Sequence, residues 1–254
     1  TLMELSVILA VVWLIVGSVM AGQSMINAAR LRTVISEYDL YTKAVHEFID
    51  RYQALPGDMN NAENVWGSDS SCPNTTHNTT PKVATCNGNG DGTISYHYYC
   101  TGLCTVAEDE AYEMFRAWQH LANARLIDGT FTGAQGSGAD RHAMPGINVP
   151  RSRAGSAGWN LLHITSVGDP SVYFSSYTSS NLLIYGTQTS SDIARDGALT
   201  PVDARSIDAK LDDSLPLSGN IRTRYDLSAT CYSGTNYLTT NTQDSCPLIF
   251  LMGM

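Results

Sequence analysis

The sequence predicts an α+β protein in which one long N-terminal helix packs against a globular head with an antiparallel sheet. Three observations predict it. An apolar run opens the chain and passes without proline into an amphipathic segment that ends at Pro56. A second helical pattern follows Thr105, and short β-branched and aromatic runs come after it. Six cysteines lie in loop-like surroundings, so we expect disulfides to staple the loops of the head.

The first 25 residues predict a transmembrane or filament-core helix. Residues 2–20 include 14 large apolar side chains, and Glu4 is the only charged residue before Arg30. A helix of about 20 apolar residues spans roughly 30 Å, the thickness of a bilayer core. A carboxylate in such a segment costs roughly 2.5–3.5 kcal/mol on insertion scales, so Glu4 needs a specific partner.

Residues 26–55 predict an amphipathic continuation of the same helix, packed on the head. Its apolar residues recur at three- and four-residue steps. They are Ile26, Leu31, Val34, Ile35, Tyr38, Tyr41, Val45, Phe48, Ile49 and Tyr52. Pro56 and Gly57 are expected to end the helix. The predicted organisation is therefore a stem helix over residues 1–55 and one globular head over residues 56–254.

The first five residues, Thr1-Leu2-Met3-Glu4-Leu5, precede the apolar run and the amphipathic helix. This order resembles the mature N-terminus of type IV pilins and type II secretion pseudopilins. Looser similarity continues in Ala54–Asp58, Phe115–Ile127 and Ile207–Asp213. The resemblance implies a processed prepilin that has lost a basic leader; the family's first residue, usually an N-methylated Phe, is not seen here.

The resemblance implies a role for the stem in assembly. Glu4 would pair with the terminal amine of a neighbouring subunit, a charge-assisted bond in place of an unpaired buried charge. The assembly residues it points to are Thr1, Glu4, Leu5, Gly17 and Gly22. For Gly17 and Gly22, with Ser18 and Ser24, two interpretations stay open: close packing of neighbouring helices through small residues, or local unwinding on assembly.

We therefore expect the major pilin of an extracellular, type IV pilus-like filament of identical subunits on the cell surface. Repeating one head-to-tail contact without closure makes a helical filament. Its precursor would be anchored in the inner membrane with the head facing the periplasm, and the pilus assembly machinery would be a partner. Adhesion, motility and secretion are the associated roles. The alternatives are a pseudopilin or minor pilin of a type II secretion or DNA-uptake system, and a membrane-anchored binding head.

Composition argues against two other classes of function. The chain has a net charge of −9, and the residues after Leu55 include 19 acidic and 11 basic side chains, a net charge of −8. A broad nucleic-acid surface is therefore not expected.

No nucleophile elbow, P-loop, zinc-protease or dinucleotide motif is present, so no catalytic residue and no enzyme are predicted. The histidines are scattered, and we expect structural or surface roles: His46, His77, His97, His120, His142 and His163.

Six cysteines allow 15 pairings, and the sequence alone does not choose among them. They are Cys72, Cys86, Cys100, Cys104, Cys231 and Cys246. Proximity along the chain suggests Cys72–Cys86, Cys100–Cys104 and Cys231–Cys246. The last pair would resemble the C-terminal disulfide loop of many pilins. Zinc and covalent haem are disfavoured, because the chain has neither C-x-x-C nor C-x-x-C-H.

The segment Asn87–Ile94 is a candidate calcium loop. Oxygen side chains at alternate positions, Asn87, Asn89, Asp91 and Thr93, reproduce the first half of an EF-hand loop. The second half fails, because Tyr98 stands where the bidentate Glu is expected. Further carboxylates would have to come from Glu108 or Glu110, or from Asp212 and Asp213. The alternative is an Asn/Gly/Asp turn. The family resemblance favours the ion, since pseudopilin heads contain calcium sites.

The head is expected to contain two helices and several strands. A capping box at Thr105 and Glu108 starts a helix that ends at Asp128–Gly129, and Thr200 caps a helix that runs to about Asp212. Strands are predicted at Trp159–Val167, Ser171–Thr178, Asn181–Thr187, Arg224–Tyr232 and Pro247–Met252. Asn74 and Asn78 match the N-glycosylation pattern; the family resemblance implies a bacterial protein, in which this match is weak.

Overall fold

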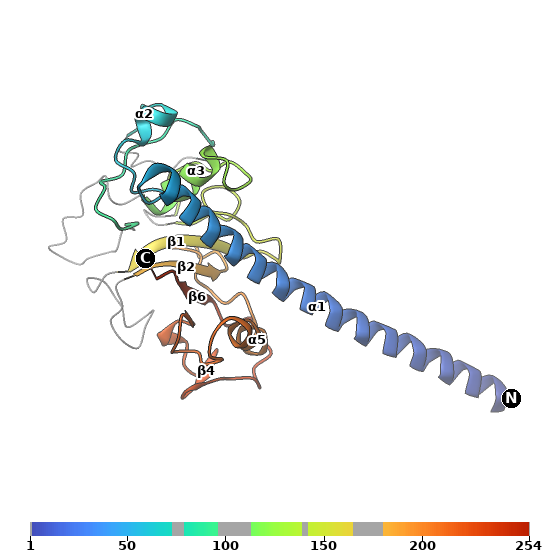
Figure 1. The fold of residues 1–254 in the computed structure, drawn as a ribbon. Helices are drawn as coiled ribbons and strands as arrows, with labels where there is room; N and C mark the ends of the chain where they lie inside the picture. Colours follow the sequence, from blue (N-terminus) through green and yellow to red (C-terminus); the bar gives the residue numbers. More distant parts are fainter. Residues whose placement is uncertain (1, 73–78, 96–112, 139–141, 165–179, 254) are drawn as a thin grey trace.

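A computed structural model of the chain describes residues 2–72, 79–95, 113–138, 142–164 and 180–253. A single long helix projects from a head built of short helices and a small antiparallel sheet (Figure 1). The α+β class expected from the sequence is confirmed.

The stem is one continuous helix, α1 (Leu2–Tyr52), of 51 residues. At 1.5 Å per residue it is roughly 75 Å long. It ends three residues before the predicted Leu55, because Gln53 takes a left-handed conformation with φ 53° and its N–H donates to the Ile49 carbonyl at 2.8 Å. Pro56 therefore follows the turn that ends the helix and does not itself cause it.

The sheet has four antiparallel strands in the order β1-β2-β6-β3. Their bounds are β1 (Gly158–Ile164), β2 (Ser180–Gly186), β3 (Ile221–Arg222) and β6 (Leu248–Leu251). Nearly every residue of β1 and β2 is buried, so both faces of the sheet are covered. The strands predicted around residues 159–167, 181–187 and 247–252 are confirmed within a few residues. The strand predicted at Ser171–Thr178 lies outside the described residues.

The strand predicted at Arg224–Tyr232 is wrong. The segment forms a 3-10 turn, η1 (Tyr225–Leu227), and then a tight turn in which Ala229 has φ 71°. Only its last residue reaches a strand, in the hairpin of β4 (Tyr232–Ser233) and β5 (Asn236–Tyr237). The Cys231 N–H donates back to the Leu227 carbonyl at 3.0 Å, so local bonds replace a sheet ladder.

In the part of the head that the structure describes there are three short helices: α2 (Ala62–Trp66), α3 (Glu113–Asn123) and α5 (Pro201–Leu211). In α5, the Thr200 side chain accepts the Asp203 N–H at 3.2 Å, as the sequence predicts. Helix α3 stops at Asn123, before the predicted Asp128–Gly129, and Arg125 follows with φ 59°. The capping box predicted at Thr105 and Glu108 lies outside the described residues.

The stem, α3 and the sheet share one core. The Tyr41 ring meets Trp118 of α3 edge-on at 5.0 Å between centroids and Trp159 of β1 at 5.7 Å. Tyr38, one turn earlier, stacks on Phe250 of β6 at 4.6 Å. These aromatic contacts bury the apolar face of the second half of α1, as the amphipathic pattern predicts.

A buried carboxylate joins the stem to the first strand. Glu37 is only 1% exposed, and its oxygens accept hydrogen bonds from Ser152 Oγ at 2.6 Å and Trp159 Nε1 at 2.9 Å. The backbone N–H of Arg153 donates a third bond at 2.7 Å. Because a buried carboxylate is costly without donors, these bonds fix the position of α1 on the head.

We predict that Glu37→Gln weakens the head, because the amide NH2 group would face a donor where a carboxylate oxygen now accepts. The expected loss in the free energy of unfolding is about 2–3 kcal/mol, typical of hydrogen bonds to a charged group. Denaturant unfolding of the full-length protein in detergent, followed by tryptophan fluorescence, would measure it. Glu47→Gln is the matched control, since Glu47 is exposed on the same helix and pairs only at the surface with Arg51. Equal stability of the two variants would contradict the assignment.

Candidate functional site

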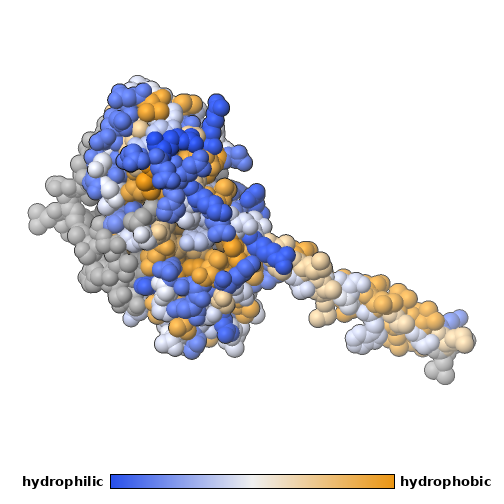
Figure 2. All heavy atoms as spheres, in the orientation of Figure 1, coloured by the Kyte–Doolittle hydropathy of each residue, from blue (hydrophilic) through white to orange (hydrophobic). Residues whose placement is uncertain are grey.

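The most unusual surface of the molecule is the protruding stem, residues 3–26 of α1. Apolar side chains are exposed all around it: Met3 is 79% exposed, Trp13 74% and Leu14 72%. Figure 2 shows that this helix is largely apolar and extends from a more hydrophilic head. The helix is long and apolar enough to cross a membrane, and none of its most apolar stretch is buried in the single chain.

The predicted assembly residues lie along the protruding stem, except Thr1, which is outside the described residues. Leu5 is 59% exposed, and nothing approaches within 4 Å of the positions that side chains at Gly17 and Gly22 would occupy. Ser18 Oγ donates to the Leu14 carbonyl at 2.6 Å, and the helix is unbroken through this segment. In the single chain the small residues are therefore helical and uncovered. Close packing and unwinding on assembly both stay predictions.

Two polar residues of the stem, which the apolar pattern does not include, form hydrogen bonds with the head. Asn27 Nδ2 donates to Asp203 Oδ1 at 2.8 Å, and the Arg30 guanidinium donates to the Ala198 carbonyl at 2.8 Å. Ile26, which the sequence placed first in the head-facing stripe, is 72% exposed and belongs to the protruding stem. The hydrogen bond between α5 and the stem is made by the next residue, Asn27, with Asp203 in the first turn of α5.

The predicted calcium loop wraps around a buried carboxylate. Asp58 is 3% exposed, and its oxygens accept the N–H groups of Gly90 at 2.6 Å, Asp91 at 3.0 Å and Gly92 at 2.9 Å. Glu113, at the start of α3, accepts the N–H of Asn89 at 3.0 Å. Amide dipoles thus converge on negative charge, as in backbone nests that bind anions.

The predicted ligand side chains are engaged in hydrogen bonds with the protein itself. Asn87 Oδ1 accepts the Glu63 N–H at 2.9 Å, and Asn89 Oδ1 accepts the Asp91 N–H at 3.0 Å. Asp91 Oδ1 accepts both the N–H and the hydroxyl of Thr93 at 2.8 Å. This arrangement fits the turn that was the alternative to a calcium loop, and an ion held by these four side chains would have to replace those bonds. Calcium binding here stays a prediction.

The other predicted calcium carboxylates, Asp212 and Asp213, lie at the end of α5 with Asp208. The ligand oxygens of these three residues are within 4.8 Å of one another. Burial raises the pKa of Asp208 to about 6, against a hydrogen bond of 2.8 Å from the Tyr237 hydroxyl that favours the charged form. The described hydrogen bonds of the cluster go to residues 214–237 and not to the calcium loop. Glu108 and Glu110 lie outside the described residues.

Glu113 is the most strongly perturbed carboxyl near the loop. It is fully buried, and burial raises its pKa to about 7. The Ser95 N–H, which donates at 2.8 Å, and the Asn89 N–H oppose this shift, whereas the negative charges of Asp58 and Asp91 add to it. Sequence reasoning did not identify Asp58 and Glu113 as part of this site. The backbone N–H groups that donate to their carboxylates belong to residues far away in the sequence.

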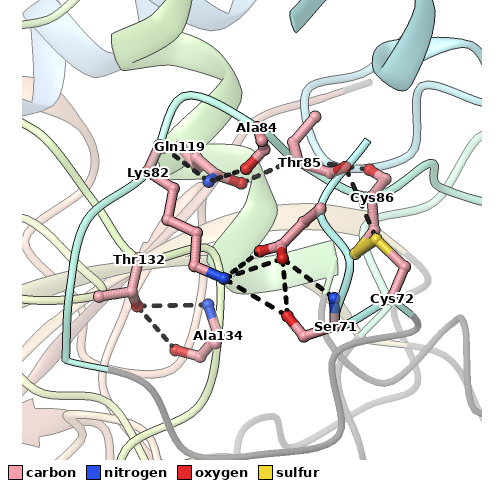
Figure 3. A network of polar contacts seen from close by, with 10 residues as sticks. Ser71, Cys72, Lys82, Ala84, Thr85, Cys86, Gln119, Thr132 and Ala134 are labelled. Atoms are coloured by element: carbon pink, nitrogen blue, oxygen red, sulfur yellow. Dashed lines mark hydrogen bonds and ion pairs between the residues drawn. A yellow bond between two sulfur atoms is a disulfide. The ribbon is translucent and has the colours of Figure 1, made fainter. Parts of the chain in front are cut away.

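A second polar network stabilises the segment beside the first disulfide (Figure 3). Lys82 Nζ pairs with the Asp69 carboxylate at 2.6 Å, and Gln119 Nε2 donates to the carbonyls of Lys82 and Ala84. Thr85 Oγ1 donates to Gln119 Oε1 at 2.7 Å. The network ties the loop that Cys72–Cys86 closes to helix α3.

His120 has a structural place in the same region. Its Nδ1 accepts the Gly57 N–H at 3.0 Å, so the neutral ring carries its proton on Nε2, which lies 3.0 Å from Thr85 Oγ1. Burial, with the nearby Arg116 charge, lowers its pKa to about 3. Both ring nitrogens are engaged, and the ring stays neutral at physiological pH.

Two of the three suggested disulfides are confirmed, Cys72–Cys86 and Cys231–Cys246. Cys100 and Cys104 lie outside the described residues, as do the glycosylation candidates Asn74 and Asn78. The confirmed bridges close local loops with separations of 14 and 15 residues. Each removes loop-closure freedom from the unfolded chain.

No protein-family model matches this chain, and neither a curated protein nor a solved structure is significantly similar to it. The long apolar helix and the small antiparallel head are consistent with the shape of a pilin.

We predict that Glu113 makes the head less stable as pH rises. Its folded pKa of about 7 exceeds the ordinary value of 4.5, so the folded state binds the proton more tightly than the unfolded state. The stabilisation is complete below about pH 4.5 and is lost as pH rises through about 7. Glu113→Gln should remove up to about 3 kcal/mol of the fall in the free energy of unfolding between pH 5 and 8, which appears as a flatter fall in melting temperature. Asp50→Asn, at an exposed site on α1, should keep the wild-type slope, and an unchanged slope in Glu113→Gln would contradict the prediction.

For calcium, the expected result is a lower melting temperature of the full-length protein in EGTA, restored by added calcium. Asp91→Asn should abolish the difference, because it removes the only charge among the four candidate ligands. Asp128→Asn, at another exposed aspartate followed by glycine, should retain it. Identical unfolding curves with and without EGTA, together with no calcium in native mass spectra, would rule the site out.

Proposed function

We propose that this chain is a structural subunit of a type IV pilus-like filament in which the protruding stems of many copies form the core. The observation that supports it is the protruding stem itself, an apolar helix that the head leaves uncovered from Met3 to Ile26. The resemblance of the first five residues to pilins and pseudopilins points the same way.

The apolar surface of the stem needs a second environment. At about 1.5–3 kcal/mol for each large side chain, withdrawing it from water is worth tens of kcal/mol as an upper bound. Among the described residues, the head buries none of the most apolar stretch of the stem, and the Asn27–Asp203 hydrogen bond lies after that stretch. A bilayer supplies it before assembly, and a bundle of identical helices supplies it afterwards. We therefore propose an inner-membrane precursor and an extracellular filament.

Glu4 gives the proposed assembly its register. It stands in the first turn of α1, at the end of the protruding stem farthest from the head. Inside a bundle of apolar helices its carboxylate would need a cation, and the terminal amine of a neighbouring subunit is a suitable one. A subunit docked at another height would leave the charge without that partner, so the pair would select one stagger between neighbours.

The head is suited to the outer surface of such a filament. Among its described residues two disulfides close loops, and the residues after Leu55 have a net charge of −8. Hydrogen bonds hold the stem to it through Glu37, Asn27 and Arg30. A force applied to the stem would therefore pass into the folded core of the head and not into a flexible linker.

Electron microscopy of sheared extracellular material tests this proposal against its alternatives. A filament subunit should be the dominant protein of sheared fibres. A pseudopilin or minor pilin would be scarce there and found with a secretion or DNA-uptake apparatus. A membrane-anchored binding head would remain in the membrane fraction without fibres.

We predict that Glu4→Ala permits membrane insertion but reduces filament yield at least tenfold, since a lost charge-assisted bond of about 1.5–3 kcal/mol recurs at every subunit. Immunoblots of sheared and membrane fractions would measure both pools. Glu47→Ala is the control, an equal charge change at an exposed position on the head-bound half of the stem. Normal yield of filaments from Glu4→Ala would exclude the proposed role of this residue.

A further inference from the structure

We propose that Asn89 is a latent site of spontaneous deamidation, and that the buried carboxylate of Asp58 protects it in the folded protein by holding the backbone N–H of Gly90. This inference rests on the geometry of the loop of residues 87–92 and does not depend on the proposed filament.

The fold itself requires the Asn-Gly pairs at which deamidation can occur. The loop has the sequence Asn-Gly-Asn-Gly-Asp-Gly, and each glycine is required by its place around Asp58. Gly90 and Gly92 have φ of 77° and 85°, values that other residues rarely adopt. A side chain at Gly88 would clash with the backbone of Asp58. Glycine therefore follows both asparagines for structural reasons.

An asparagine followed by glycine is chemically labile. The glycine nitrogen loses its proton and attacks the side-chain Cγ of the asparagine, forming a C–N bond. The side-chain nitrogen leaves as ammonia and a succinimide remains, which water then opens to aspartate or isoaspartate. Nothing is oxidised or reduced, and water is the only co-reactant. Glycine favours the attack because it has no side chain to hinder it.

At Asn89 the structure blocks this attack in two ways. The Gly90 N–H donates to Asp58 Oδ1 at 2.6 Å and to the Asp58 carbonyl at 3.0 Å. A carboxylate beside the amide opposes loss of the proton, because the nitrogen would become negatively charged next to another negative charge. The Asn89 side chain is held as well, since its Oδ1 accepts the Asp91 N–H at 3.0 Å.

Asn87 provides a comparison within the same loop. The Gly88 N–H donates to the Met59 carbonyl at 2.9 Å, and Asn87 Oδ1 accepts the Glu63 N–H at 2.9 Å. Neither bond involves the Asp58 carboxylate. Removing that carboxylate should therefore expose Asn89 to cyclisation and leave Asn87 protected.

The test uses the full-length protein in detergent, as wild type and as Asp58→Asn, with a synthetic peptide of residues 84–95 for the intrinsic rate. After incubation in mildly alkaline buffer, peptide mass spectrometry quantifies the conversion of each amide to a carboxyl, and isoaspartate is assayed enzymatically. We expect Asn89 to react at least roughly tenfold more slowly in the folded wild type than in the peptide, and roughly tenfold faster in Asp58→Asn than in wild type. Asn87 should stay intact in both proteins.

Three outcomes would overturn the proposal: reaction of Asn89 in the wild type at the peptide rate, no acceleration in Asp58→Asn, or equal acceleration of both asparagines. If Asp58→Asn does not fold, the wild type carries the test. Deamidation of Asn89 and hydrogen exchange of the Gly90 amide are then followed together as urea is raised below the unfolding transition. The two rates should rise in parallel, and deamidation while the Gly90 amide is still protected would refute the mechanism.

Discussion

The carboxylate of Glu37 is buried between α1 and β1, and this burial constrains how the stem sits on the head. A buried carboxylate needs donors, and those of Ser152, Arg153 and Trp159 all belong to the segment that enters the first strand. Only one rotation and one height of the helix bring Glu37 to them. In that position Tyr41 also meets the rings of Trp118 and Trp159, so the polar anchor and the apolar core specify the same arrangement.

Because α1 is unbroken, the anchor also determines what the other half of the helix does. Residues 3–26 are held away from the head, and a single chain leaves their apolar side chains exposed. The uncovered face of the second half is different in character, with Asp39, Lys43, Glu47 and Asp50 exposed there. One helix therefore presents an apolar surface at one end and a charged surface at the other. This division matches a subunit that places its N-terminal half in lipid or among copies of itself, and its head in water.

The loop around Asp58 shows that one sequence pattern can be compatible with two arrangements, one that binds a cation and one that surrounds a carboxylate. Oxygen side chains at alternate positions, from Asn87 to Thr93, indicate a cation site when read along the chain. In the fold, the backbone N–H groups of the loop point at the carboxylates of Asp58 and Glu113, and the side-chain oxygens cap the turn. The same glycines serve both arrangements, so the choice depends on which distant acid lies inside the loop.

The sequence by itself determined the elements that depend on local chemistry: the long stem, the Thr200 cap of α5 and three strands of the sheet. Periodicity and capping are sufficient for these. Short separations along the chain only suggested the disulfides Cys72–Cys86 and Cys231–Cys246, and the fold decided these pairings. Tertiary structure decided where α1 and α3 end, how the segment after Arg224 turns, and which polar groups are buried. Glu37 and Asp203 have partners that are more than 100 residues away. Hydrogen bonds between such distant groups exist only once the chain has folded, so no local pattern records them, and the apolar stripe could not show that polar residues hold the stem to the head.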